Sequence, residues 1–271
     1  MFLIEVFRSK IPRAIFDRGL KIIHFSMLIK QSEVNLLKII KSIIENRYIK
    51  DGQFILSNYG VWMFNNPSDK TFELACMGYR NNLEVILSKL RTPIIFLDIG
   101  ANQGIFSIVA ARNNFIKEIH AFEPNANLCK ILNKNFLRNH IDKFKIHNYA
   151  ISLYDGPTHL SINSTHSGVG KIIQYESNSI KINSKNRIYL NEQFMKLDLP
   201  IFLKVDVEGM QHEVLEEIFS SVLKKKLLYI FVELSLDSNE NLRTINLLNE
   251  NGFTETFRKK KLIYDALFEK F

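Results

Sequence analysis

From residue 93 onward, short apolar runs alternate with stretches of helical periodicity, and this alternation limits the fold more than any other feature of the sequence. Strands that are separated by helices are joined by right-handed crossovers, which make neighbouring strands parallel and place helices on both faces of the sheet. We therefore predict an α/β, Rossmann-like domain with a central, mostly parallel sheet. The expected strands are 94–99, 119–122, 145–151, 201–207 and 227–234, and the expected helices are 103–114, 125–139, 210–225 and 238–251.

Two regions depart from this alternation. Residues 155–195 are rich in serine, asparagine and glycine, and we expect a loop or an antiparallel insert there, between the third and fourth strands. Residues 1–75 are expected to form an extension that precedes a domain of residues 76–271. Apolar residues recur in this extension at three- and four-residue steps to about residue 50, which indicates helices, and the turn signals that follow indicate a small hairpin.

The N-terminal extension is basic, because residues 1–50 contain ten lysines and arginines against four acidic residues, a formal charge of +6. A basic amphipathic helix can lie on an anionic membrane surface. However, a soluble domain seldom leaves so many large aliphatic side chains exposed. We therefore expect residues 1–50 to form a helical subdomain or a homodimer contact, with weak contact to a membrane surface as the alternative.

The composition excludes several classes of protein. No apolar run reaches the length of about 18 residues that a transmembrane helix needs. The first residues lack the apolar core and the cleavage site of a signal peptide. Two cysteines, Cys76 and Cys129, are too few for a disulfide framework or a zinc site. We therefore predict a cytoplasmic protein, which would lie at the inner face of the membrane if its basic N-terminus binds lipid.

The strongest local signal is an apolar strand, residues 94–99, that runs into a glycine turn with the sequence GANQG at residues 100–104. Gly100 allows a positive φ, and Gly104 lets the backbone approach a ligand where a helix begins. The next expected strand ends at Glu123, which lies 19 residues beyond Gly104. An acid at this place can accept hydrogen bonds from the two hydroxyls of a ribose. The pattern therefore indicates a nucleoside cofactor.

The turn favours S-adenosylmethionine over a dinucleotide. It lacks the middle glycine that a pyrophosphate requires, whereas the methionine part of S-adenosylmethionine carries a carboxylate and an amine but no phosphate. Asp98 offers a carboxylate to that amine, directly or through water, and the turn offers N–H groups to the carboxylate. The third strand would end beside the adenine, where Asn148 or the adjacent backbone would bond the adenine edge, unless Asn148 is only a strand-end residue.

The expected fourth strand carries three charges, Lys204, Asp206 and Glu208, which share one face while the strand stays extended. Charges on a central strand are costly unless they are paired or lie at the carboxyl edge, where ligands bind in open α/β sheets. Two acids at this edge indicate chemistry, and His212 in the next helix is a further candidate base. Glu233 in the fifth strand would line the same site or face solvent. The structural alternatives are a Lys204–Asp206 ion pair, a favourable charge of Glu208 at a helix start, and an exposed His212.

Five segments along the chain resemble the successive motifs of FkbM-type methyltransferases, and they span about residues 78–235. The resemblance implies a class I, S-adenosylmethionine-dependent methyltransferase, of a family in which many members O-methylate sugars or natural products. One departure is Gln211, where members of the family often have glutamate. The segments are FLDIGANQGIFSIVAA, IHAFEPNANLCKILNKNF, NYAIS, HSGVG and LKVDVEGMQHEVLE.

The resemblance also implies roles for single residues. Asp206 and Glu208 would face the methyl group and the acceptor. Ala101 lies in the glycine turn and Asn148 lies in the third expected strand. Because of these positions we include both among the candidate cofactor contacts. By resemblance, the contacts to the cofactor would come from Asp98, Gly100, Asn102, Gly104, Glu123 and Asn125.

We predict methyl transfer to a hydroxyl of a sugar, a glycan precursor or a related small molecule. Asp206, Glu208 or His212 would take the hydroxyl proton, or a divalent cation such as Mg²⁺, held by Asp206 and Glu208, would lower the pKa of the acceptor. The rival enzyme is a nucleic-acid methyltransferase, which the basic N-terminus suggests. Methylation of a base amino group favours an Asn/Asp-Pro-Pro-aromatic turn, and this chain has Asp-Val-Glu-Gly instead. A further alternative has no catalytic activity: a cofactor-binding or membrane-surface module with a degenerate site. The intact glycine turn and the acids argue against it.

Overall fold

The computed structural model describes residues 50–271 except for 75, 77–81, 175–176, 236–238 and 259–262. The helices expected in residues 1–49, with the dimer or membrane contacts expected of them, lie outside the described residues. The chain divides into two compact units, Met1–Asn65 and Asn66–Phe271. In the described part of the first unit, a three-stranded antiparallel sheet occupies the region where the turn signals indicated a hairpin. Its strands are β1 (Lys50–Asp51), β2 (Phe54–Leu56) and β3 (Trp62–Phe64).

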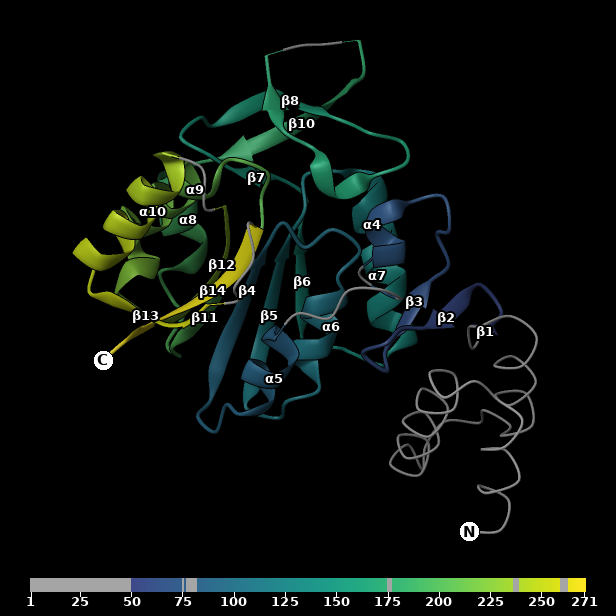
Figure 1. Cartoon of the computed structure of the whole chain (residues 1–271), viewed down its shortest axis with the longest axis horizontal. Coiled ribbons are helices and arrows are strands. Elements are labelled where there is room, and N and C mark those ends of the chain that lie inside the picture. The colour runs from purple at the N-terminus through teal and green to yellow at the C-terminus, as the bar shows by residue number, and fades with distance from the viewer. Residues whose placement is uncertain (1–49, 75, 77–81, 175–176, 236–238, 259–262) are drawn as a thin grey trace. The chain divides into compact units, whose positions relative to one another are not determined.

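The second unit is built on a seven-stranded sheet with the order β13-β14-β12-β11-β4-β5-β6 (Figure 1). Neighbours from β12 to β6 are parallel, while β14 is antiparallel to both β12 and β13. This confirms the predicted α/β, Rossmann-like class. The strands are β4 (Ile94–Ile99), β5 (Ile116–Phe122), β6 (Phe144–His147), β11 (Ile201–Val205), β12 (Leu227–Ser235), β13 (Phe253–Arg258) and β14 (Ile263–Lys270).

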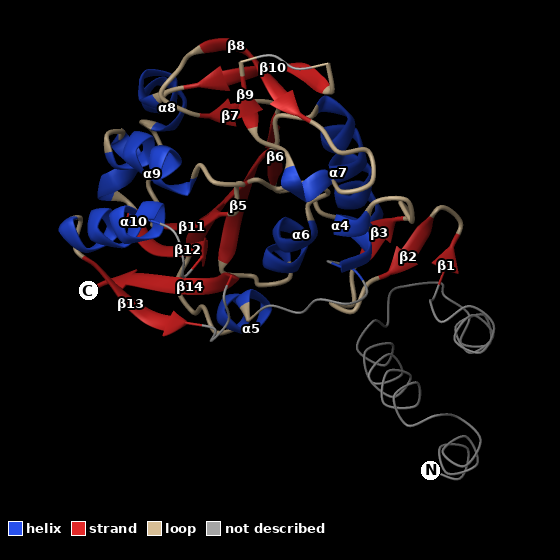
Figure 2. Cartoon of the chain, turned by 45° about the horizontal axis from the view of Figure 1, so that its top comes forward, coloured by secondary structure: helices blue, strands red, loops and turns tan. Residues whose placement is uncertain are grey.

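Helices cover both faces of this sheet: α5, α6 and α7 lie on one face and α8, α9 and α10 on the other (Figures 1 and 2). A short helix, α4, precedes them in the chain, and η2 and η3 are single 3₁₀ turns. No described helix is long and apolar enough to cross a membrane. The helices are α4 (Lys70–Glu73), α5 (Leu83–Ser88), α6 (Ile105–Ala111), α7 (Ala126–Arg138), η2 (Ser167–Val169), α8 (Arg187–Phe194), α9 (Gln211–Phe219), η3 (Val222–Lys225) and α10 (Asn239–Glu250).

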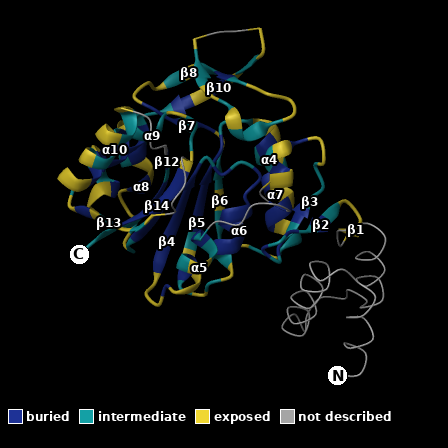
Figure 3. Cartoon of the chain, in the orientation of Figure 1, coloured by how far each residue is buried: buried dark blue, intermediate teal, exposed yellow. Residues whose placement is uncertain are grey.

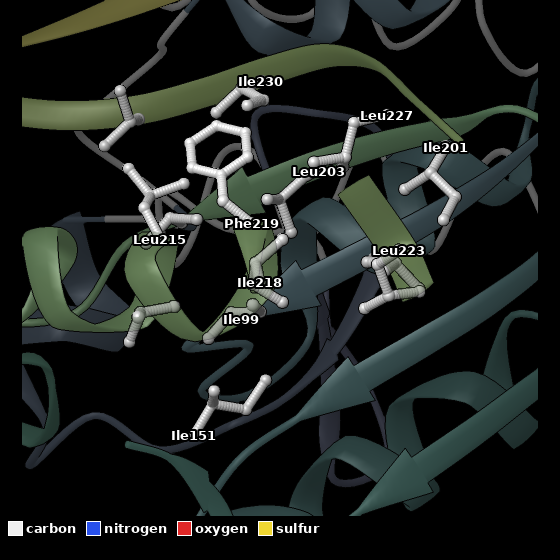
Figure 4. Packing of buried hydrophobic residues seen from close by; sticks show 14 of the residues in the cluster. Ile99, Ile151, Ile201, Leu203, Leu215, Ile218, Phe219, Leu223, Leu227 and Ile230 are labelled. Carbon is white, nitrogen blue, oxygen red and sulfur yellow. The ribbon is translucent and has the colours of Figure 1, made fainter. Parts of the chain in front are cut away.

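The two central strands, β4 and β11, are buried along their whole length (Figure 3), because helices cover both faces of a parallel sheet. On one face, Ile99 and Leu203 lie in the main hydrophobic cluster together with Leu215 and Ile218 of α9 (Figure 4). Apolar burial of this kind stabilises a fold by about 25 cal/mol per Å². The strands carry charge on their other face, described below.

The structure corrects two expected strands. The third divides into β6 and a separate strand, β7 (Ala150–Ile151), and the fourth ends at Val205. Asp206 and Glu208 therefore lie beyond β11, because the chain turns there toward α9, with Gly209 at φ +72°. A four-stranded insert sheet of order β7-β10-β8-β9 follows β6, with β8 antiparallel to both its neighbours, as expected for an antiparallel insert. Its other strands are β8 (Gly156–Ser161), β9 (Ile172–Ile173) and β10 (Ser179–Lys185).

Candidate active site

The glycine turn follows β4 and contacts the chain where the neighbouring strands β5 and β11 end. Gly100 has φ +78°, as expected for a turn that only glycine adopts easily. A Cβ on Gly100 would lie 1.9 Å from the backbone oxygen of Asp206, so a larger residue would push β4 and β11 apart. The N–H groups of Gly100 and Ala101 both donate to the carbonyl of Phe122 at the end of β5, at 3.1 and 3.0 Å. The turn is therefore held from both sides at the edge where ligands bind.

Gly104, at the other end of the turn, is also required by packing. Its φ is +83°, and a Cβ there would lie 2.8 Å from Cγ of Leu132. The absent side chain therefore allows α7 to pack closely beneath the turn. Asn102, between the two glycines, also has a positive φ, of 50°. Asparagine tolerates this conformation better than most residues do.

Glu123, at the end of β5, lies against the turn. Its carboxylate accepts the backbone N–H of Asn102 at 3.0 Å and that of Asn125 at 2.9 Å, and the residue is only 5% exposed. Burial raises the pKa of Glu123 to about 7, although the two N–H groups act to lower it. The side chain of Asn125 caps α7 by accepting the N–H of Asn127 at 3.0 Å. The structure thus brings Glu123, Asn102 and Asn125 together.

Asp98 and Lys204 form a buried ion pair beneath the turn, on the face that α6 covers. Asp98 is 0% exposed, and its two oxygens accept Nζ of Lys204 at 2.9 Å and Oγ of Ser107 at 2.7 Å. Burial acts to lower the pKa of Lys204, but Asp98 and Asp206 outweigh it and raise that pKa above its ordinary value. Both oxygens of Asp98 are bonded within the protein. The placement of Asp98 therefore gives no support to its expected contact with the methionine amine.

Three carboxylates gather where β11 and β12 end. Asp206 is the most open, with its side chain 44% exposed and 3.3 Å from Nζ of Lys204. Burial and Asp206 raise the pKa of Glu208, while Lys171 and His166 act to lower it. Burial, followed by Asp206, Asp265 and Glu208, raises the pKa of Glu233 to about 8. Glu233 therefore belongs to the same charged group as Asp206 and Glu208, which was one of its two expected places.

Two other candidates lie apart from these acids. The ring of His212 contacts Arg243 of α10 at 3.3 Å and Glu216 of α9 at 3.5 Å, so its contacts among the described residues point toward the helices. The side-chain amide of Asn148 donates to the carbonyls of Glu123 and Pro124 at 3.0 and 2.9 Å. It therefore braces the chain after β5.

The geometry does not support the expected Mg²⁺ site. Over the part of the chain that the structure describes, no group of three or more His, Cys, Asp or Glu residues is arranged to hold a metal ion. Asp206 instead contacts Lys204, whose ammonium supplies the local positive charge.

Sequence reasoning missed two residues that contact the glycine turn. Asp69, the N-cap of α4, accepts the side-chain amide of Gln103 at 2.8 Å, and Ser167 of η2 bonds the side chain of Asn102 at 3.0 Å. Ser167 lies in the HSGVG segment that the family resemblance includes, but no spacing connects that segment to the turn. Asp69 has only the local signal of an acid before a short helix.

A model of the methyltransferase FkbM domain family matches residues 98–255, which include the turn, Glu123 and the three acids. No curated protein matches the chain significantly. Among solved structures, a precorrin-6y C5,15-methyltransferase from Geobacter metallireducens GS-15 is 14% identical, with a TM-score of 0.40 over 70% of this chain and 86% of that chain. A ribosomal protein L11 methylase from Lactobacillus delbrueckii subsp. bulgaricus is 12% identical, with a TM-score of 0.43 over 71% and 81%. An rRNA methylase from Streptococcus thermophilus is 11% identical, with a TM-score of 0.43 over 69% and 93%.

Proposed function

Because this chain belongs to the FkbM methyltransferase family, we propose that it transfers a methyl group from S-adenosylmethionine to a hydroxyl of a sugar, a glycan precursor or a related small molecule. The observation that carries the choice of a hydroxyl acceptor is the group of Asp206, Glu208 and Glu233 at the carboxyl edge of the sheet. Carboxylates accept hydrogen bonds from hydroxyls, and burial makes two of these three better bases than an exposed carboxylate.

The residues of the turn fit the cofactor. We assign the ribose to Glu123, whose oxygens accept two backbone N–H groups among the described residues, which leaves lone pairs for hydroxyl donors. Gly100 keeps this edge free of a side chain between β4 and β11. When bound, S-adenosylmethionine supplies a methyl carbon to which the acceptor oxygen bonds as the carbon–sulfur bond breaks and leaves its electron pair on sulfur.

The chain itself has to orient the acceptor and take its proton. The sulfonium is already activated, so holding the acceptor oxygen in line contributes most of the rate that the protein can add. Asp206 and Glu208 follow β11 directly, and Glu233 lies beside them on β12, so one carboxylate can accept the hydroxyl proton while another holds a second hydroxyl of the acceptor. Lys204 limits the mutual repulsion of these acids by its contact with Asp206.

Nucleic acid is the weaker candidate acceptor. Three carboxylates at the reacting edge would repel a phosphate backbone, which normally meets lysine and arginine. The basic character that suggested nucleic acid lies in residues 1–50, almost all of them outside the described part of the chain. The expectations of a homodimer or membrane contact through that segment, and of a cytoplasmic location, stay predictions.

An acceptor screen tests the proposal. Labelled S-adenosylmethionine would be offered with nucleotide sugars, glycans, lipids and RNA, with excess S-adenosylhomocysteine as the inhibited control. We expect label in a carbohydrate-containing fraction, in a form that mild alkali does not release, because an O-methyl ether survives such treatment and a methyl ester does not. Label that enters RNA, and no carbohydrate, would contradict the proposed acceptor.

The pKa of Glu123 predicts how cofactor binding depends on pH. Ribose hydroxyls donate to the ionised carboxylate, and with a pKa of about 7 this form is lost below neutral pH. We expect the affinity for S-adenosylhomocysteine to rise about tenfold between pH 6 and pH 8, as calorimetry would measure. Glu123→Gln should remove this dependence, and Glu123→Ala should weaken binding by about 1.5–3 kcal/mol.

Glu118 provides a matched control on the same strand. Although burial acts to raise its pKa, contacts with Lys145 and His120 lower it below the ordinary value, so Glu118 stays ionised throughout this pH range. Glu118→Gln should keep both the affinity and its dependence on pH. A pH dependence that survives in Glu123→Gln would show that another group is responsible.

A further inference from the structure

Asp69 is a buried carboxylate at which three segments of the chain meet. It is 4% exposed, and it caps α4 by accepting the N–H of Thr71 at 3.0 Å. It also accepts the N–H and the hydroxyl of Ser167, at 3.0 and 2.6 Å, and the side-chain amide of Gln103, at 2.8 Å. A carboxylate is buried away from water only where donors of this kind replace the hydrogen bonds that water would make to it. Asp69 thus ties the start of α4 to η2 and to the glycine turn.

A line of hydrogen bonds runs from Asp69 to the acid that faces the ribose. The hydroxyl of Ser167 donates to Asp69 and accepts the side-chain amide of Asn102 at 3.0 Å. The side-chain oxygen of Asn102 accepts the N–H of Gln103 at 2.9 Å, and its backbone N–H donates to Glu123 at 3.0 Å. Asn102 therefore has both its side chain and its left-handed backbone, at φ 50°, determined by these partners. We call Asp69, Ser167 and Asn102 the clasp.

The clasp holds a loop that also reaches the acids. The η2 loop, residues 162–171, is seated on α4 by two backbone contacts: Gly168 donates to Oγ1 of Thr71 at 2.7 Å, and Lys70 donates to the carbonyl of Thr165 at 2.7 Å. Lys171 of the same loop approaches the acids, since a Cβ on Gly209, the residue after Glu208, would lie 3.8 Å from Nζ of Lys171, and both Lys171 and His166 act to lower the pKa of Glu208. The η2 loop therefore contacts the cofactor turn through Ser167, and it approaches the acids of the acceptor side through His166 and Lys171.

Gln103 makes a second link between Asp69 and the glycine turn. Its side-chain nitrogen is used by Asp69, and its backbone carbonyl accepts the amide of Asn135 at 2.8 Å. The side-chain oxygen is left buried without a partner within the described structure. The contacts of Gln103 that the structure does show, to Asp69 and Asn135, hold the turn against α4 and α7.

We infer that Asp69 and Ser167 are positioning residues that couple the η2 loop to the cofactor turn, so that cofactor binding orders the acceptor side of the site. This inference rests on the proposed function, since it assigns the turn to the cofactor and the acids to the acceptor. By thermodynamic linkage the coupling is reciprocal, and an acceptor that orders the loop would raise the affinity for the cofactor.

Hydrogen exchange of the full chain, with and without S-adenosylhomocysteine, tests the coupling. In the unaltered protein the ligand should slow exchange both in the turn, residues 100–104, and in the η2 loop, where the N–H of Ser167 reports on its contact with Asp69 and the N–H of Gly168 on the contact of the loop with α4. In Ser167→Ala, which removes the hydroxyl between Asp69 and Asn102 but leaves the N–H at position 167, Asp69 and the cap of α4 in place, the ligand should still protect the turn but should protect the loop much less. The affinity of Ser167→Ala for S-adenosylhomocysteine should fall about threefold to tenfold, which corresponds to the loss of about one hydrogen bond.

Ser161→Ala is the matched control, because Ser161 lies in the same insert and its hydroxyl accepts the N–H of Lys171 at 2.9 Å, outside the clasp. It should behave like the unaltered protein. Asp69→Ser, which keeps a capping hydroxyl on α4 but is too short to reach Gln103, should reproduce the effect of Ser167→Ala. The inference is overturned if the ligand protects the η2 loop equally in Ser167→Ala, or if it protects only the turn in the unaltered protein. No acceptor is used, so an error in the proposed acceptor class would not alter either result.

Discussion

Replacing Lys204 by methionine is expected to lower the free energy of unfolding by about 3–5 kcal/mol, because it leaves the Asp98 carboxylate buried without its cation. The two side chains are 2% and 0% exposed, with Nζ and Oδ1 2.9 Å apart. Methionine keeps the length and the apolar stem of lysine, so the loss reports mainly on the charge. Urea unfolding of the full chain, followed by circular dichroism, would measure it.

An ion pair in the insert provides the control for this substitution. Lys185 and Asp155 are also 2.9 Å apart, but their side chains are 29% and 37% exposed. Lys185→Met should therefore cost less than about 1 kcal/mol. Adding Asp98→Asn to Lys204→Met should recover part of the loss, since the buried group is then neutral. Equal effects of Lys204→Met and Lys185→Met would mean that the buried pair does not support the edge of the sheet.

Asp206→Asn and Glu208→Gln are each expected to lower turnover by about 100-fold or more, the range for loss of a general base. Both changes keep the size of the side chain and remove its ability to take a proton. The fold and most of the affinity for S-adenosylhomocysteine should remain, because Glu123 and the turn are unchanged. Turnover of the acceptor found in the screen, with binding measured beside it, separates the two effects.

Glu213→Gln is the matched control, since Glu213 lies in the first turn of α9 and accepts the N–H of Leu153 at 2.9 Å. Its turnover should stay within a few-fold of the unaltered enzyme. If the turnover of Asp206→Asn and of Glu208→Gln also stays within a few-fold of the unaltered enzyme, neither acid has a chemical role. A loss confined to Glu233→Gln would assign the base to that residue, whose raised pKa of about 8 suits proton abstraction near neutral pH.

Local patterns in the sequence were sufficient to predict the parallel core of the fold. Apolar strands, helical periodicity and the glycine turn act over a few residues, so β4, α6 and the positive φ of Gly100 could be expected without any partner. The C-terminal strands β13 and β14 were missed. They are antiparallel to their neighbours, and their sequences become strands only by pairing with each other and with β12.

The sequence by itself determined the class of the fold, the glycine turn and the acid that ends β5, because each follows from spacing along one short segment. The tertiary structure alone decided which side chains contact one another. Asp98 pairs with Lys204 across 106 residues, and Ser167 meets Asp69 across 98. Contacts of this kind depend on which strands and loops the sheet brings to one edge, and side-chain spacing along the chain carries no record of that. For this reason the sequence did not reveal that Asp98 is buried against Lys204 beneath the glycine turn, or that Asp69, with no signal beyond a helix cap, lies at the centre of the clasp.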